Sequence, residues 1–72
     1  MHEVRSEITG RVWQVRVDEG QLVAEGTELV ILESMKMEIP VTTEVPGVVR
    51  ELHVAEGDTV HEGALIALID ES

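Results

Sequence analysis

The sequence predicts an all-β domain made of two four-stranded antiparallel sheets that pack face to face. Three observations indicate this class. Short runs of β-branched and aliphatic residues recur along the chain, and glycine-containing turns separate these runs. The spacing of these glycines and apolar residues also occurs twice, as an internal repeat. The chain has 72 residues, enough for one small domain, and we expect that domain to span residues 1–72.

The repeat appears when the chain is shifted by 37 residues, which places the two copies at about 8–34 and 45–72. Eight residues are identical between the copies, and three of them are glycines: Gly10, Gly20 and Gly26 fall on Gly47, Gly57 and Gly63. Neither copy could bury an apolar face alone. We therefore expect the copies to pack together about an approximate two-fold axis. Trp13 falls on Arg50, and we expect this only aromatic residue to pack in the core or at its rim. The alternative is a partly exposed tryptophan that could contact a partner.

The strands follow from period-two alternation and from apolar runs bounded by turn residues. They are expected at 4–8, 12–17, 21–23, 28–33, 37–43, 48–54, 58–60 and 64–69. The glycines at 20, 26, 57 and 63 are assigned to turns, where glycine accepts a positive φ without steric cost. Pro40 has no N–H to donate, so its strand should lie at the edge of a sheet. No stretch shows a convincing helical period.

The charge and composition exclude several classes of partner. Fifteen acidic residues against five basic ones give a formal net charge of −10, which repels nucleic-acid phosphates and anionic lipid. No apolar run approaches the roughly 18–20 residues that span a bilayer. The N-terminus lacks the features of a secretory signal, so we expect a cytoplasmic location. There is no cysteine, and the spacing of His2, His53 and His61 matches no metal-binding motif.

The candidate site is the joint between the copies, residues 35–44, which holds the only lysine of the chain, Lys36. This connection has none of the residues, such as Asn-Gly, that a tight hairpin prefers. Local rules are most often broken where function demands particular side chains. Met35 and Met37 would offer a partner an adaptable contact surface. Taken singly, the lysine could be a plain solvated charge and the methionines could be core residues; together they predict an exposed hairpin that presents an amine.

The segment Glu33-Ser34-Met35-Lys36-Met37-Glu38 resembles the attachment sequence of the biotinyl/lipoyl carrier domain family, whose hallmark is Met-Lys-Met. The glycine-containing repeats resemble that family over nearly the whole chain. The resemblance implies a flattened β-barrel, also called a barrel-sandwich hybrid, with a modified lysine on an exposed hairpin. Lys36 would carry covalent biotin. The residues read by a biotin ligase and by the carboxylase would be Met35 and Met37, with Glu33, Ser34 and Glu38 beside them.

The function that the resemblance implies is that of a small biotin carboxyl carrier protein, which is not an enzyme by itself. Its biotin arm would take an activated carboxyl group between biotin carboxylase and carboxyltransferase subunits. Ser34 stands where many members have Ala, and Ile39-Pro40 stands where many have Asn. One alternative is a lipoyl carrier, although lipoyl members usually have Asp before the lysine and Ala after it. A less favoured alternative is an unmodified barrel-sandwich interaction module, which would carry a long helical hairpin at the joint.

Overall fold

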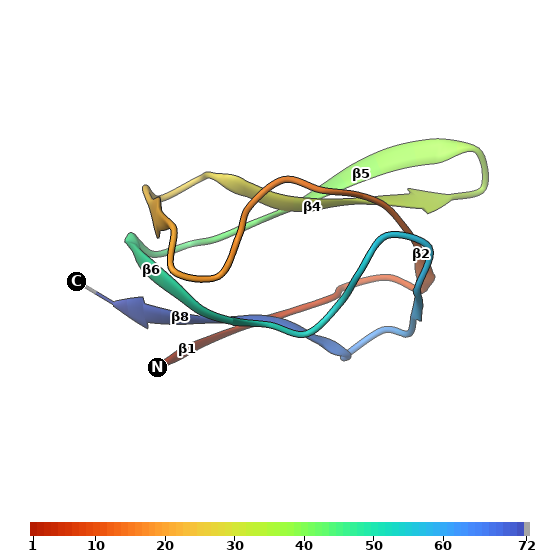
Figure 1. Ribbon diagram of the computed structural model, residues 1–72. Coiled ribbons are helices and arrows are strands. Elements are labelled where there is room, and N and C mark those ends of the chain that lie inside the picture. The colour runs from red at the N-terminus through yellow and green to blue at the C-terminus, as the bar shows by residue number, and fades with distance from the viewer. Residues whose placement is uncertain (72) are drawn as a thin grey trace.

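The computed structural model describes residues 1–71 and contains eight strands (Figure 1). In chain order they are β1 (His2–Arg5), β2 (Gly10–Val15), β3 (Leu22–Val23), β4 (Glu28–Ser34), β5 (Met37–Thr42), β6 (Gly47–Leu52), β7 (Thr59–Val60) and β8 (Leu65–Glu71). They form two antiparallel four-stranded sheets, in the orders β1-β8-β6-β3 and β5-β4-β2-β7. The predicted fold class is confirmed. Across residues 1–71 no helix is long and apolar enough to cross a membrane.

The two sheets are copies of each other. Adding 37 to the bounds of β2, β3 and β4 gives the bounds of β6, β7 and β8. The order of strands follows the same shift of 37 residues. Replacing each strand of β5-β4-β2-β7 by its counterpart in the other copy gives β1-β8-β6-β3. Each copy therefore contributes its short strand, β3 or β7, to the sheet that the other copy dominates. This exchange joins the halves, neither of which could form a stable sheet alone.

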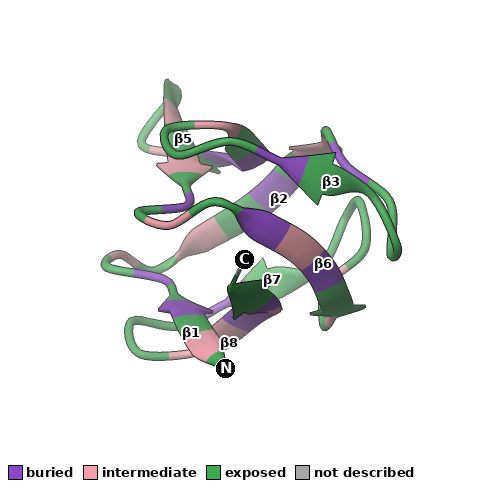
Figure 2. Ribbon diagram, turned by 90° about the vertical axis from the view of Figure 1, so that its left-hand side faces the viewer, coloured by how far each residue is buried: buried purple, intermediate pink, exposed green. Residues whose placement is uncertain are grey.

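The core lies between the sheets and consists of aliphatic side chains, as the composition requires. The buried positions form bands on strands of both sheets (Figure 2). The fully buried large side chains include three pairs related by the shift of 37 residues: Leu29 with Ile66, Leu32 with Ile69, and Val12 with Val49. Each such residue contributes about 1.5–3 kcal/mol by leaving water. The repeat therefore supplies two matching apolar faces.

Hydrogen bonds also cross between the copies in matched pairs. The Gly20 N–H donates to the Val49 carbonyl at 2.7 Å, and the Gly57 N–H donates to the Val12 carbonyl at 2.8 Å. Both glycines have a positive φ, 88° and 93° respectively. The turn geometry that the sequence predicts at these glycines therefore also provides the donors that connect the repeats.

Two buried hydroxyl groups bend the chain away from the edge strands. The Thr43 hydroxyl donates to the Val45 carbonyl at 2.8 Å and accepts from the Val45 N–H at 3.2 Å. Ser6, the residue related by the shift, makes the same pair of bonds with Ile8. These bonds engage the backbone N–H and C=O groups of Ile8 and Val45, which would otherwise be available to continue the pairing between strands. They explain why β1 ends at Arg5 rather than at the expected residue 8.

The edge strands are β1 and β3 in one sheet and β5 and β7 in the other. Pro40 lies on β5, which pairs only with β4, so the prediction that this proline marks an edge is confirmed. Its missing N–H removes a donor that another chain could pair with, as is common at exposed edges.

Candidate functional site

The predicted site lies at the tip of the β4–β5 hairpin. Ser34 pairs with Met37 and Glu33 pairs with Glu38, so only Met35 and Lys36 remain to form the turn. The hairpin extends to the end of the molecule opposite the N and C termini (Figure 1). The molecule is elongated, with extents of 35 × 18 × 17 Å, so Lys36 lies at one end of its long axis.

The turn residues adopt a backbone conformation that their side chains disfavour. Met35 has φ 54° and Lys36 has φ 63°, and they are the only non-glycine residues in 1–71 with a positive φ. Positive φ at both central positions is the signature of the type I′ hairpin turn, which usually takes Asn-Gly. An L residue in this region costs about 1–2 kcal/mol. The paired strands β4 and β5 hold the turn in this conformation. Met35 and Lys36 therefore occupy the turn at a conformational cost, although other residues would form it more easily.

The three side chains at the tip are open to solvent. Met35 is 94% exposed and Met37 is 64% exposed, so neither belongs to the core. Lys36 is also exposed. Within residues 1–71 its amine makes no ion pair and no side-chain hydrogen bond. The amine can therefore be approached by a large partner.

The base of the hairpin carries a pair of like charges. Glu33 and Glu38 lie directly opposite each other across the ladder, and both are exposed. Facing carboxylates destabilise a strand pair. They also place negative charge beside the only lysine of the chain. The facing carboxylates are therefore a second destabilising feature of residues 33–38, in addition to the strained turn.

Gly10 supports the hairpin from the neighbouring strand, a role that the sequence analysis did not assign. A Cβ atom at Gly10 would lie 2.9 Å from the Glu33 carbonyl oxygen and 3.6 Å from the Ser34 Cβ atom. The absence of a side chain therefore lets β2 lie close to β4 just before the turn. The sequence carried a signal for this role, because Gly10 matches Gly47 across the two copies.

Trp13 lies outside the buried core and is partly exposed, which fits the alternative expectation better than packing in the core. Its side chain is 45% exposed. The β2–β4 ladder has an irregularity between Val12 and Gln14, so Trp13 is the extra residue of a bulge. The second copy has the matching irregularity around Arg50. Simple alternation along the strand cannot predict such a bulge.

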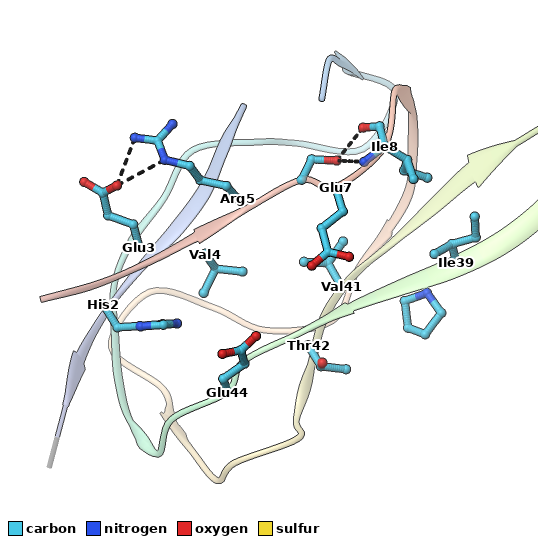
Figure 3. Close-up of a pocket in the computed structure, with 12 residues that line it drawn as sticks. His2, Glu3, Val4, Arg5, Glu7, Ile8, Ile39, Val41, Thr42 and Glu44 are labelled. Carbon is cyan, nitrogen blue, oxygen red and sulfur yellow. Dashed lines mark hydrogen bonds and ion pairs between the residues drawn. The ribbon is translucent and has the colours of Figure 1, made fainter. Parts of the chain in front are cut away.

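A groove of about 470 Å³ runs between the edge strands β1 and β5 (Figure 3). The side chains of Glu7 and Glu44 are directed into it. Arg5 turns away: its guanidinium lies 3.0 Å from the Glu3 carboxylate and donates to the Gly63 carbonyl at 2.8 Å. His2 and Ser6 also line the groove, and the Ser6 hydroxyl is engaged with the carbonyl and the N–H of Ile8. No cluster of metal-ligating side chains is found among residues 1–71.

The fold and the hairpin define a class: a small β-barrel with repeated halves that presents one lysine at the tip of a strand pair. The sequence profile of the Biotin_lipoyl family, described as "Biotin-requiring enzyme", matches residues 3–69. The chain belongs to this family. The resemblance found in Met35-Lys36-Met37 and in the glycine repeats is thereby confirmed.

Similar curated proteins carry names of the same kind. The chain is 59% identical over 39 residues to the biotinylated protein TB7.3 homolog of Mycolicibacterium smegmatis, covering 54% of this chain and 55% of that protein. It is 44% identical over 41 residues to the biotin/lipoyl attachment protein of Bacillus subtilis, covering 57% of this chain and 56% of that protein. The matched segment thus spans little more than half the length of these relatives.

Solved structures share the whole fold. The Kluyveromyces lactis urea carboxylase superposes on 96% of this chain with a TM-score of 0.90 and 35% identity, and the match covers 6% of the carboxylase chain. A single-chain, multi-domain long-chain acyl-CoA carboxylase superposes on 99% of this chain with a TM-score of 0.92 and 25% identity, and the match covers 7% of that chain. This fold therefore occurs as a small part of much larger carboxylases.

Proposed function

We propose that the chain is a biotin carrier and that biotin is joined to the Nζ atom of Lys36 through an amide. The observation that carries this proposal is the placement of the only lysine at the tip of a strained, exposed hairpin, between two exposed methionines. Family membership and the names of the relatives support biotin as the group. The geometry fits the group, since nothing in residues 1–71 covers the tip.

The attachment step needs an enzyme. Amide formation requires an activated biotin carboxyl group and the loss of a proton from the Nζ atom. A biotin ligase would supply biotinyl-adenylate and take up the proton. The Nζ atom then attacks the activated carbonyl carbon, the C–N bond forms, and AMP leaves with the electrons of the broken C–O bond. Amide formation removes one positive charge, which takes the formal net charge from −10 to −11.

The chain itself then serves as a rigid base for a flexible arm. Biotin supplies the ureido nitrogen that accepts and releases a carboxyl group, while the protein controls where that nitrogen can reach. Carboxylation and carboxyl transfer would take place on biotin carboxylase and carboxyltransferase subunits. Tethering keeps the arm at a high effective concentration near both sites. In this proposal the domain is a non-catalytic component of a biotin-dependent carboxylase.

The residues around Lys36 are assigned to recognition. Met35 and Met37 expose flexible thioether side chains that can adapt to more than one partner surface. Glu33 and Glu38 offer negative charge to a basic docking face. Ser34, which is half-buried at the base of the turn, helps to set the position of the tip. None of these residues is needed for the barrel core.

The test is expression of the chain with a biotin ligase and biotin, followed by intact-mass measurement and avidin binding. The wild type should gain the mass of one biotinyl group, and Lys36→Arg should gain none. A wild type without added mass, or a Lys36→Arg variant with it, would refute the assignment. Parallel expression with a lipoate ligase tests the lipoyl alternative, since the Bacillus subtilis relative is named for both groups. A lipoyl mass gain in place of a biotinyl one would favour that alternative.

A further inference from the structure

The feature that the proposed function does not use is Trp13, an exposed tryptophan on the strand next to the hairpin. We propose that the outer face around Trp13 is a resting site for the bicyclic ring of the biotin carried by Lys36. This inference rests on the proposed function. It adds that the arm spends part of its time folded back on its own carrier.

The fold itself does not require an aromatic side chain at position 13. The second copy builds the same bulge with Arg50, which lies 4.0 Å from Asp70 and is exposed. Trp13 leaves a large apolar surface in water although the same backbone accepts a charged side chain. The two copies thus differ at a position on β2, which pairs with β4 of the hairpin, whereas Arg50 lies on β6 in the other sheet. A ligand carried by the hairpin accounts for the difference.

The surroundings of Trp13 match the polar groups of biotin. A shallow hollow beside the indole ring is lined by Arg11, Glu33 and Glu56. A ureido group has two N–H donors and one carbonyl acceptor. The carboxylates can accept from the donors and the guanidinium can donate to the carbonyl. Within residues 1–71 Arg11 forms no ion pair, so its donors are not already engaged.

The distance is within reach of the arm. Ser34 pairs with Met37, so Lys36 lies about three residue steps beyond Leu32, on the β5 side of the turn, and Leu32 pairs with Val12 next to Trp13. At about 3.3 Å per residue, and with two steps of about 4.8 Å from β5 across β4 to β2, the separation from Lys36 to Val12 is roughly 14 Å. About eleven bonds join the lysine Cα atom to the ring, which gives an extended length on the order of 14 Å at about 1.3 Å of rise per single bond of about 1.5 Å. An arm laid across β4 therefore brings the ring to Trp13.

The groove between β1 and β5 is the competing location, and it is less suited to the ring. Glu7 and Glu44 direct carboxylates into it (Figure 3). Arg5, the arginine of that strand, is engaged with Glu3 and with the Gly63 carbonyl. The one ring that lines the groove is the imidazole of His2, which offers a bicyclic ring much less apolar surface than an indole does.

Trp13 provides its own test, because it is the only tryptophan and the chain has no tyrosine or phenylalanine. The emission spectrum and acrylamide quenching of the unmodified and the fully biotinylated protein should be compared. Acrylamide is chosen because it is neutral and the protein is strongly acidic. We expect the emission of the biotinylated form to shift to shorter wavelength and its quenching constant to fall by about half, since the exposed part of the indole loses water contact. Nuclear Overhauser effects should join biotin ring protons to the indole.

The repeat supplies a matched control. The double variant Trp13→Arg, Arg50→Trp moves the only tryptophan to the equivalent bulge of the other sheet. The variant keeps the composition and formal charge of the chain. Its melting temperature should be measured to confirm folding. We expect its emission and its quenching to be the same with and without biotin, because position 50 lies on β6, in the sheet that does not contain the hairpin.

The outcomes separate the two proposals. If intact mass shows no biotinyl group on the wild type, the proposed function fails and this inference fails with it. If the mass is gained but Trp13 emission and quenching do not change, the resting site is refuted while the carrier function stands. Nuclear Overhauser effects from the ring to Ile39 or Val41 in place of Trp13 would move the ring to the groove and refute the site. An equal response in the double variant would also refute it.

Discussion

The hairpin turn can be relaxed without altering Lys36 by replacing Met35 with asparagine. Met35 has φ 54°, where most L residues cost about 1–2 kcal/mol, whereas asparagine enters this region readily because its short amide hydrogen-bonds locally. Met35 is 94% exposed, so the change gives up almost no buried apolar surface. We expect Met35→Asn to raise the free energy of unfolding by about 1 kcal/mol. In a domain of this size that raises Tm by about 4–8 °C.

Two measurements on the same samples check this prediction. Thermal unfolding followed by circular dichroism gives Tm, and intact mass at fixed ligase concentration gives the rate of biotinylation. The rate should fall in Met35→Asn, because a thioether contact is lost while the lysine stays. Met37→Asn is the matched control: Met37 lies on β5 without a positive φ, and asparagine is disfavoured in strands. Its Tm should stay the same or fall.

The reasoning fails if Met35→Asn leaves Tm unchanged, because the turn would then store no strain. It also fails if Met37→Asn raises Tm equally, since the gain would not come from the left-handed conformation. A stabilised Met35→Asn with an undiminished biotinylation rate would show that the methionine before the lysine is not read by the ligase.

Three further changes test the recognition residues and the frame. Met37→Ala should leave Tm within about 2 °C and slow biotinylation, because its side chain is exposed. Gly47→Ala should lower the free energy of unfolding by about 3 kcal/mol or more, because the added methyl group would overlap the Asp70 carbonyl oxygen and φ is 158°. Thr43→Val should cost about 2 kcal/mol in urea unfolding, because the buried hydroxyl satisfies both the N–H and the carbonyl of Val45.

Each of these changes has a control in the chain. A fall in Tm for Met37→Ala that matched its loss of biotinylation would make Met37 a packing residue. Gly10→Ala should destabilise less than Gly47→Ala, because its nearest contact, the Glu33 carbonyl oxygen, is at 2.9 Å. Equal losses would contradict the steric argument. Thr42→Val, at the exposed neighbouring position, should change stability by less than about 0.5 kcal/mol. A loss as large as that of Thr43→Val would contradict the role of the buried hydroxyl.

The sheets could be predicted because the repeat constrains them twice. Glycines that recur at one spacing mark the turns. The apolar runs between these turns, such as Leu29-Val30-Ile31-Leu32, are long enough for a strand but too short for a helix. The exchange of β3 and β7 between the sheets could not be predicted, because two-residue strands carry too little pattern to show their partners. The residues at which β1 and β5 end could not be predicted either, because they depend on the Ser6 and Thr43 hydroxyl groups rather than on the hydrophobic pattern.

The hairpin could be predicted from the residues that it lacks. A tight turn without Gly, Asn or Asp implies that Met35 and Lys36 serve something other than the turn, and their positive φ values agree with this. Trp13 could not be placed in the same way. A bulge shifts a side chain to the outer face without leaving any mark in the alternation of the strand, so the pattern could not decide between core or rim packing and partial exposure.

The position of the lysine follows from how the symmetry is broken. β5 and β4 correspond to β1 and β8, but only β5 and β4 are joined by a turn. That turn can therefore vary without altering any contact that both copies share. The two destabilising features of the hairpin lie in and beside this turn. One is the left-handed conformation of Met35 and Lys36, and the other is the pair of facing carboxylates, Glu33 and Glu38. Two unfavourable choices within six residues, on a frame that is otherwise locally consistent, indicate that this segment is shaped by what binds it.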